Sequence, residues 1–486
     1  MTFLDSGEKR VRVGSIGSSL AVLLLLSACG SNGKGVEQTS GETAAARWSE
    51  TTARQLHEAI AGRAAHGLDR LRFEDIAPGA PLDDAALTRA ALAYAAALAG
   101  GASDPAKLYR VYTLPRSKPD LPRGLAAALA AGRVGEWLAS LAPQDDGYRT
   151  LSRAYLALRG HDDAVPAIPQ AKAALKPGAT DPRIPAIARQ LAAFDYLDAS
   201  AAQGERYTPA MVAAVRRMQA DYGIRPDGTI GDETIAILNL SDADRARAIA
   251  VDMERMRWLE RTPPATRIDV NLAAARLTYW RDGKIADTRK VVIGKPDTET
   301  PQIGSPIFRL VANPTWTVPR SIERKEIAGK GAAYLRRNDM MWKDGRVVQR
   351  SGPRNALGLV KFDMRNPYAI YLHDTPAKQL FAVVQRERSH GCVRVEDALG
   401  FAEMLARDEG VLDRWNEARA SGKEAFVGLP REIPVRLLYQ TVLLDKDGDP
   451  IVRGDPYEWN DRIAAALGFG GANGHHLRAG SGDLGP

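Results

Sequence analysis

This chain of 486 residues has few cysteines and no large excess of either positive or negative charge. Only two cysteines occur, Cys29 and Cys392, and they could pair with each other in an oxidising compartment. The 66 basic and 59 acidic residues leave a formal net charge of +7, and no block of like charge stands out. This pattern predicts no nucleic-acid partner, although a mildly basic balance would suit an acidic polymer.

Long hydrophobic runs are missing as well. With 45% hydrophobic and 26% charged residues, the chain is globular rather than multispanning, and its length allows three domains. The apolar stretch at 21–26 follows basic residues at 9–12 and is too short and too early for a comfortable membrane span. This pattern predicts a secretion signal over residues 1–28.

The predicted signal ends in Leu26-Ser27-Ala28-Cys29, which resembles the lipobox of bacterial lipoproteins. That resemblance implies cleavage before Cys29, acylation of this cysteine, and a location in the periplasm on a membrane anchor. The alternative is an ordinary signal peptide with an incidental cysteine. If Cys29 carries lipid, Cys392 has no disulfide partner, and an unpaired thiol in such a compartment invites a chemical explanation.

Alanine-rich helical patterns follow a polar, flexible tether predicted at 29–45. A helical scaffold domain is predicted over 46–202, with one apolar helix face formed by Leu87, Ala91, Tyr94 and Leu98. Asp83 and Asp84 lie near the expected start of that helix. Further helices are predicted for three ranges: 123–141, 148–158 and 184–197. The region has no fixed internal period and no residues that indicate chemistry.

A compact helical unit is predicted over 203–242. Thr208-Pro209 is a good helix start, and Met211, Val215 and Met218 fall on one face of that helix. Asp227-Gly228 then indicates a tight turn before a second helix. The pattern resembles the peptidoglycan-binding module of bacterial cell-wall enzymes. The alternative is a small helical hairpin that binds no ligand.

The pattern changes from helices to strands at about residue 266. Alternating apolar residues predict strands at 267–272, 275–280, 290–294, 307–311, 368–373 and 435–444, with a turn at Asp282-Gly283. A polar, helix-prone insertion at about 320–350 is typical of a lid or binding loop. A helix is expected at 396–407, and the Gly-rich tail at 470–486 is expected to be disordered. The predicted architecture is multidomain α+β, with a mainly β domain at 264–465 after the two helical parts.

The stretch Ser389-His390-Gly391-Cys392-Val393-Arg394 combines a thiol with an adjacent histidine. Alternation along the preceding strand places Tyr371 and His373 together on its outer face. A histidine near Cys392 could take the thiol proton, and Gly391 allows a sharp turn whose backbone N–H groups could bind an oxyanion. The spacing alone leaves open a buried structural cysteine and histidine. It also leaves open a zinc site, although the chain has no Cys-x-x-Cys or His-x-x-x-His pair.

His373, fifteen residues, then Ser389-His390-Gly391-Cys392 resembles the signature of the L,D-transpeptidase catalytic domain, the YkuD-type fold. The segments 294–296, 313–319, 321–322, 355–358 and 361–362 resemble the YcbB-like subgroup.

By this resemblance Cys392 is the nucleophile, His373 is the general base, and the backbone carbonyl of Asp374 orients the imidazole. His390 and Gly391 would line the oxyanion site together with Cys392. Substrate contacts are expected from Ser389, Trp316, Tyr371 and Arg394. Many family members have Asn where Arg394 stands, and its guanidinium is expected to position the loop or a substrate carboxylate.

The resemblance implies acyl transfer on peptidoglycan stem peptides, without a metal or other cofactor. A thioester on Cys392, formed with loss of a terminal D-alanine, would be opened by a neighbouring stem amine to give a 3–3 cross-link. Water as acceptor would make the enzyme a carboxypeptidase, and a protein lysine would make it a protein-to-wall ligase. The alternative outside enzymes is a lipoprotein that only tethers the membrane to the wall.

Overall fold

The computed structural model describes residues 47–73, 83–160, 166–170, 173–201, 204–445 and 447–470. The predicted signal peptide, Cys29, the whole predicted tether and nearly all of the C-terminal tail lie outside these ranges. None of the helices in the described part combines the length and apolar composition that a membrane span requires.

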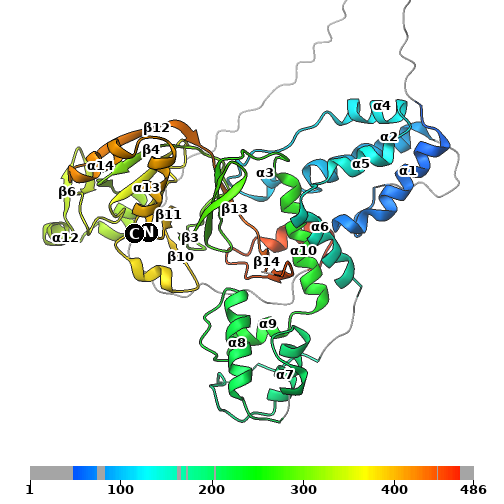
Figure 1. Ribbon diagram of the computed structural model, residues 1–486, viewed down its shortest axis with the longest axis horizontal. Helices are drawn as coiled ribbons and strands as arrows, with labels where there is room; N and C mark the ends of the chain where they lie inside the picture. Colours follow the sequence, from blue (N-terminus) through cyan, green and yellow to red (C-terminus); the bar gives the residue numbers. More distant parts are fainter. Residues whose placement is uncertain are drawn as a thin grey trace, which may run out of the picture. The chain divides into compact units, whose positions relative to one another are not determined.

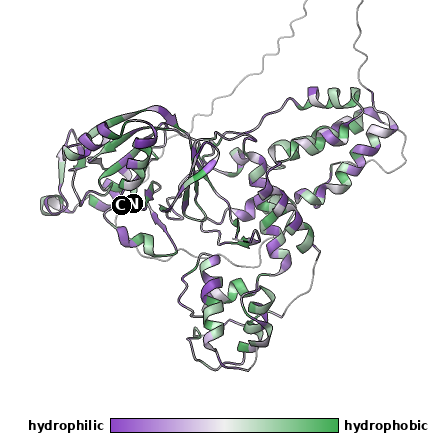
Figure 2. Cartoon of the chain, viewed as in Figure 1, coloured by the Kyte–Doolittle hydropathy of each residue, from purple (hydrophilic) through white to green (hydrophobic). Residues whose placement is uncertain are grey.

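The first part of the fold is helical, as predicted. Its α-helices are α1 (Glu50–Ala61), α2 (Asp84–Gly100), α3 (Pro105–Leu108), α4 (Leu121–Ala130), α5 (Val134–Leu141) and α6 (Asp146–Leu158), with a 3₁₀ turn at Gly62–His66 (Figure 1). Figure 2 shows that these helices carry both hydrophobic and hydrophilic residues.

Helix α2 forms as its pattern predicts. The Asp83 carboxylate caps it by accepting from the N–H groups of Ala85 and Ala86, which otherwise have no partner in the helix. The predicted apolar face is buried. The single run expected at 123–141 is instead two helices, α4 and α5, because Gly132 adopts a φ of +66° between them and ends the first.

The second helical unit contains α7 (Ile184–Ala193), α8 (Pro209–Asp221) and α9 (Asp232–Leu238), with a 3₁₀ turn at Ala199–Ala201. Thr208 caps α8, and Met211, Val215 and Met218 are buried, as predicted. The buried Gln219 amide fixes the following turn, since it accepts from Gly228 N and donates to Thr229 O. Helix α7 ends four residues before the predicted limit of 197, next to Asp195, which has a φ of +59°.

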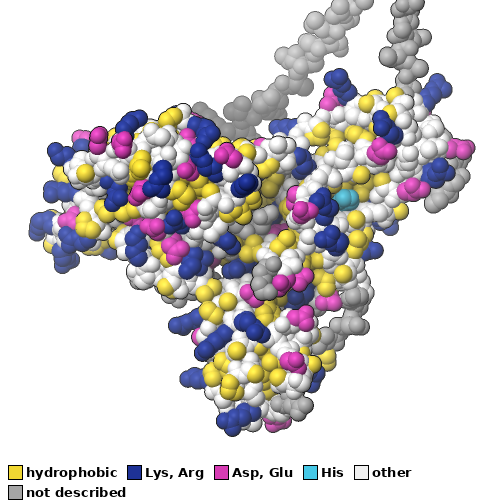
Figure 3. Space-filling view, in the orientation of Figure 1, with side chains coloured by type: hydrophobic (Ala, Val, Ile, Leu, Met, Phe, Trp, Pro, Cys, Tyr) yellow, Lys and Arg dark blue, Asp and Glu magenta, His cyan; other side chains and the backbone are white. Residues whose placement is uncertain are grey.

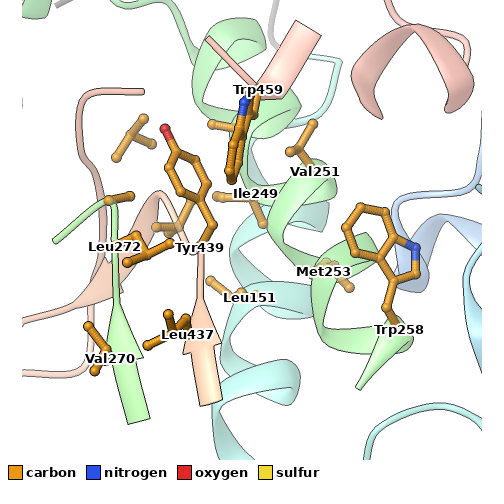
Figure 4. Close-up of a cluster of buried hydrophobic side chains, with 14 of the residues drawn as sticks. Leu151, Ile249, Val251, Met253, Trp258, Val270, Leu272, Leu437, Tyr439 and Trp459 are labelled. Atoms are coloured by element: carbon orange, nitrogen blue, oxygen red, sulfur yellow. The ribbon is translucent and has the colours of Figure 1, made fainter. Parts of the chain in front are cut away.

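A long helix that the patterns did not indicate, α10 (Asp242–Trp258), follows. Ser241 and Asp244 form a capping box at its start. Its apolar side chains, including Ile249, Val251 and Met253, lie beside Leu151 of α6 and strand residues Val270 and Leu437 in one cluster (Figure 4). The helix was missed because it also buries five charged residues: Arg247, Asp252, Glu254, Arg255 and Arg257.

The last part is a mainly β domain built on a ten-stranded sheet, as predicted. The strand order is β12-β4-β8-β9-β11-β3-β2-β1-β13, and β10 pairs with β3. The strands are β1 (Arg267–Asn271), β2 (Arg276–Arg281), β3 (Lys284–Gly294), β4 (Ile307–Ala312), β8 (Val360–Met364), β9 (Leu372–His373), β10 (Glu387–Ser389), β11 (Val393–Val395), β12 (Ala425–Ile433) and β13 (Val435–Leu438). Asp282 and Gly283, both with positive φ, form the predicted turn between β2 and β3.

Helices and a small hairpin complete this domain. Helices α13 (Ala398–Asp408) and α14 (Leu412–Ala420) pack on the sheet (Figure 1). Phe401 of α13 lies 5.6 Å from Phe362 of β8, measured between ring centroids. The remaining elements are a 3₁₀ turn at Lys378–Ala382, β14 (Val442–Leu444), β15 (Pro450–Val452) and α15 (Asn460–Ala466).

Three sequence expectations differ from the structure in this domain. The strand predicted at 368–373 is limited to β9, because Ala369 has a φ of +55° that strands do not accommodate. The strand predicted at 435–444 is two strands, β13 and β14, in different sheets. The insertion at 320–350 is partly β: β6 (Met340–Lys343) and β7 (Arg346–Gln349) form a sheet with β5 (Trp316–Thr317). Its helical turns are α11 (Arg320–Ile322), a π-helix (Glu323–Ile327) and α12 (Gly331–Arg337).

Candidate active site

A pocket of about 480 Å³ lies between the insertion and the ends of β9 and β10. Six of the nine predicted site residues line it: Trp316, Tyr371, His373, Ser389, His390 and Cys392. Gly391, Asp374 and Arg394 do not line the pocket. The structure therefore brings the predicted nucleophile and the predicted base to one cavity, although eighteen residues separate them in the sequence.

Backbone pairing fixes the nucleophile relative to the base. Strands β9 and β11 are parallel neighbours, with Leu372 opposite Val393 and His373 opposite Arg394. Val393 N also donates to Tyr371 O at 3.2 Å. Cys392 therefore immediately precedes β11 and lies near Tyr371, and its position relative to His373 depends on sheet register rather than on side-chain contacts.

The imidazole of His373 is buried and neutral. Its Nδ1 lies 2.5 Å from the backbone oxygen of Asp374. Because a carbonyl only accepts, Nδ1 carries the proton and Nε2 keeps a lone pair. Burial, reinforced by the nearby Arg394 cation, lowers the pKa of His373 from 6.5 to about 3. The ring can thus accept a proton at Nε2 at physiological pH.

The carboxylate of Asp374 is engaged elsewhere. It accepts from Leu359 N at 2.9 Å and forms an ion pair with Lys378. The geometry matches the expectation that the carbonyl of this residue, and not its side chain, faces the imidazole.

Cys392 is a free, half-buried cysteine. Its Sγ lies 3.6 Å from the carbonyl oxygen of Ala369, within reach of a weak S–H hydrogen bond. Burial raises the pKa of the thiol. Burial and the nearby Cys392 also raise the pKa of Tyr371 well above its usual value. The resting site therefore contains a thiol, a phenol and an imidazole, all uncharged at physiological pH.

The turn that carries Cys392 is held by its own hydrogen bonds. The Ser389 hydroxyl donates to Cys392 O at 2.6 Å and accepts from Gly391 N at 3.1 Å. Gly391 has a φ of +113°, and its carbonyl accepts from Thr300 Oγ1 at 2.9 Å. The glycine thus permits the predicted sharp turn. However, its N–H is bonded to Ser389 in this structure, so an oxyanion at this group would have to replace that hydrogen bond.

Arg394 does not lie where a substrate contact would require. Arg394 is only 1% exposed and does not line the pocket, which differs from the expectation of contact with a substrate carboxylate and leaves the other expectation, that it positions the loop. The cation lies close enough to His373 to help lower the pKa of the imidazole. Trp316, by contrast, is buried in a small cluster against which Tyr371 packs.

The insertion contributes residues that the sequence analysis did not name. Lys325, Glu326 and Arg346 line the pocket opposite Cys392. Residues 320–350 contain nine basic and four acidic side chains, a net charge of +5 out of +7 for the whole chain. Figure 3 shows Lys and Arg side chains gathered at the end of this domain that carries α12 and β6. This local excess of positive charge could have been recognised in the sequence as an indication that the insertion contributes to the site.

Comparison with known proteins places the site in a family context. The profile of the L,D-transpeptidase catalytic domain (YkuD) matches residues 265–435. Residues 44–154 match a scaffold domain, and residues 180–238 match a domain described as "Putative peptidoglycan binding domain". The last match begins before the limit of 203 expected from sequence and includes α7.

The chain is also similar to individual proteins that are named L,D-transpeptidases. A Haemophilus influenzae protein named "Putative L,D-transpeptidase" is 30% identical over 224 residues, which cover 41% of this chain and 45% of that protein. The chain therefore matches less than half the length of this relative. An L,D-transpeptidase structure from Stackebrandtia nassauensis covers 54% of this chain and 94% of its own, at 14% identity and a TM-score of 0.25. One from Xylanimonas cellulosilytica covers 55% and 99%, at 18% identity and a TM-score of 0.20. In chain order, three regions therefore match family models: a scaffold domain, the domain described as "Putative peptidoglycan binding domain", and the L,D-transpeptidase catalytic domain.

Proposed function

We propose that this protein is a cell-wall L,D-transpeptidase that forms 3–3 cross-links between peptidoglycan tetrapeptide stems through a thioester on Cys392. The observation that carries the proposal is that an uncharged thiol and a neutral imidazole line one pocket, the imidazole on β9 and the thiol on the residue just before the neighbouring strand β11. The matching family profile supports the same reaction class.

The first half-reaction forms the thioester. Nε2 of His373 takes the proton of Cys392 as Sγ attacks the carbonyl of the third stem residue. The tetrahedral intermediate collapses, the bond to the terminal D-alanine breaks, and the imidazolium returns its proton to the leaving amine. Backbone N–H groups of the turn at 390–392 and the Tyr371 hydroxyl are the candidate donors to the oxyanion. Tyr371 suits this role because its raised pKa keeps the phenol protonated.

The second half-reaction transfers the acyl group. The neutral His373 takes a proton from the side-chain amine of a neighbouring stem, and this amine opens the thioester. The new amide is the cross-link, and the proton returns to the thiol. Water or a protein lysine could use the same acyl-enzyme, so the acceptor decides between transpeptidase, carboxypeptidase and protein ligase.

Charge and domain content support a peptidoglycan substrate. Stem peptides end in carboxylates, and the insertion beside the pocket has a net charge of +5. The match at residues 180–238 supplies a candidate wall-binding module on the same chain. We further propose that the protein acts in the periplasm and is held on a membrane by lipid on Cys29. A Cys29→Ser variant tests this location, because it should abolish the lipid mass on the mature N-terminus and release the protein from membranes.

The decisive assay incubates the purified full chain with disaccharide-tetrapeptides and follows the products by mass spectrometry. We expect dimers that have lost one D-alanine, and no such dimers with Cys392→Ala. Tripeptide monomers alone would indicate the carboxypeptidase. A complete absence of thiol-dependent products would leave the tethering lipoprotein as the better description. A carbapenem-type β-lactam should also leave a covalent adduct on Cys392, because its strained ring presents an acyl group to the same nucleophile.

A further inference from the structure

One contact joins the insertion to the turn that carries the nucleophile. The Glu326 carboxylate lies 2.7 Å from Nε2 of His390, across the mouth of the pocket. The side chains of Glu326 and His390 are 34% and 18% exposed, so the contact is partly shielded from water. His390 is separated from Cys392 by a single residue, which makes this a direct link between the insertion and the nucleophile's turn.

The backbone at Glu326 has an unusual form. Glu326 belongs to the π-helix at 323–327, whose i→i+5 hydrogen bond runs from Ala328 N to Glu323 O at 2.8 Å. Single π-turns are rare and occur frequently at functional sites, because the extra residue redirects side chains. Here the turn places Lys325 and Glu326 on the pocket, whereas the exposed Arg324 does not line it.

Interactions other than the Glu326 contact hold the rest of the insertion, both within it and to neighbouring segments. It has a separate apolar cluster that includes Ile322, Ile327 and Val347. Arg346 donates to Val318 O at 2.7 Å, and Arg320 pairs with Glu323 at 2.9 Å. Removing the Glu326 carboxylate should therefore leave the insertion folded and change only its attachment to the nucleophile's turn.

The ring of His390 depends on this attachment. Within the described part of the chain, its Nδ1 is buried without a hydrogen-bond partner. Among the described residues, the polar contact of the ring is therefore the one at Nε2, where Glu326 lies. Loss of Glu326 would free this ring, which lines the same pocket as Cys392.

We propose that Glu326 is a positioning residue that closes the insertion over the pocket and orients His390 beside Cys392. The inference rests on the proposed function in one respect, since it takes Cys392 as the nucleophile. Stem peptides would enter while the contact is open, and acyl transfer would proceed while it is closed and bulk water is reduced at the thioester.

The first test measures access to the thiol and requires no transpeptidase activity. Full-length Glu326→Ala, Glu326→Gln and, as a matched control from the same turn, Arg324→Ala are treated with iodoacetamide. Labelling is followed by mass spectrometry on the tryptic peptide 389–394. We expect Glu326→Ala to label roughly twofold to fivefold faster, the range expected for loss of one partly exposed charged contact. Glu326→Gln, which can still hydrogen-bond to His390, and Arg324→Ala should stay near the original rate.

Hydrogen exchange of peptides within 320–350 separates opening of the insertion from a change in the thiol itself. Faster exchange in Glu326→Ala together with faster labelling supports the proposal. An unchanged labelling rate overturns it, and so does faster labelling without faster exchange. In the cross-linking assay, Glu326→Ala should release a larger share of hydrolysed product and Glu326→Gln should restore the original ratio. If no cross-links form with any variant, the proposed function fails, while the labelling result still decides whether Glu326 closes the pocket.

Discussion

The imidazole of His373 is oriented by a backbone carbonyl, which has consequences for which substitutions matter. A carbonyl fixes the tautomer as a carboxylate would, but it adds no negative charge to stabilise an imidazolium. Together with burial and the Arg394 cation, this arrangement keeps the ring neutral, with a pKa lowered to about 3. His373 should therefore act as a base that returns its proton quickly, rather than as one half of a stable ion pair.

Substitutions at His373 and its neighbour test this arrangement. His373→Gln should lower the rate of Cys392 acylation by about 10²- to 10⁴-fold, the usual contribution of general-base catalysis. Asp374→Asn should acylate at close to the original rate, because the carbonyl remains. The Asp374→Asn variant should instead lose about 1 kcal/mol of unfolding free energy, because it loses the ion pair with Lys378. Acylation by a carbapenem, followed by mass spectrometry, measures both rates. Equal losses in the two variants would show that the carboxylate takes part.

The pH dependence of alkylation tests the charge state of Cys392. A raised thiol pKa means less thiolate at any given pH, so alkylation should rise with pH through a midpoint above the ordinary value of about 8.5. A preformed thiolate–imidazolium pair would instead keep alkylation fast well below pH 7. The measurement is the rate of iodoacetamide labelling on peptide 389–394 between pH 5 and 10. A midpoint below 7 would contradict the neutral resting state.

At the scale of elements, the insertion brings most of the chain's excess positive charge to one side of the pocket. Lys325 is exposed on the pocket wall and has no ion-pair partner in the described ranges. It is therefore the best-placed cation for a stem carboxylate. Arg346, in contrast, is tied to Val318 O.

A charge-removing substitution tests the role of Lys325. Lys325→Gln should raise the KM for the tetrapeptide substrate roughly threefold to tenfold while changing kcat little, because an exposed charge contributes mainly to substrate binding. Added salt should reduce the difference. Lys343→Gln, on β6 of the same insertion, removes an equal charge that does not line the pocket and is the control. A fall in kcat with unchanged KM would assign Lys325 to the chemical step instead.

The elements that could be predicted from the sequence are those with a regular apolar period and an explicit boundary residue. Helix α2 has both, with Asp83 as its cap, and the β2–β3 hairpin has the Asp282-Gly283 turn. Helix α10 could not be predicted because its buried charges break the apolar pattern, and some of their hydrogen-bond partners, such as Ser103 and Thr441, lie far away in sequence. The end of the strand before His373 was misjudged because the positive φ at Ala369 leaves no mark in the apolar alternation.

The candidate site could also be predicted only in part from the sequence. Residues close to one another in the motif could be named from the sequence, and the structure brings six of them to one pocket. The positions of Arg394 behind His373 and of Glu326 opposite His390 could not be inferred, because each depends on how separate elements pack. Residue type alone indicated that Arg394 could bind an anion, whereas in the structure it is buried and its charge helps to lower the pKa of His373.

At the scale of the whole molecule, α10 connects distant segments of the chain through buried charges. The Glu254 carboxylate is fully buried and pairs with Arg257 at 2.7 Å. Its other oxygen accepts from Ser103 N and from Ser103 Oγ at 2.7 and 2.6 Å, which links the helix to a segment 151 positions earlier. Asp252 similarly accepts from Thr441 N and Val442 N.

Removing one of these charges should weaken the fold strongly. Glu254→Ala leaves the Arg257 cation buried without its carboxylate, which typically costs about 3–5 kcal/mol of unfolding free energy. The midpoint of denaturant unfolding measures the loss. Arg54→Ala, at an exposed position of α1, should change stability by less than about 0.5 kcal/mol and is the control. A loss from Glu254→Ala as small as that of the control would mean that water enters and solvates the Arg257 cation.

The parallel register of β9 and β11 has a consequence for how this site can vary. Leu372 pairs with Val393 and His373 pairs with Arg394. The separation of base and nucleophile is therefore set by the backbone pairing of two neighbouring strands. Of the fifteen residues between His373 and Ser389, Asp374 orients the imidazole and those of β10 pair with β3, whereas the exposed residues contribute little to that separation. Natural or engineered chains can therefore lengthen, shorten or replace the exposed part of this connection and keep the reacting groups in place. The connection is thus a natural place to graft a new recognition element onto an unchanged catalytic pair.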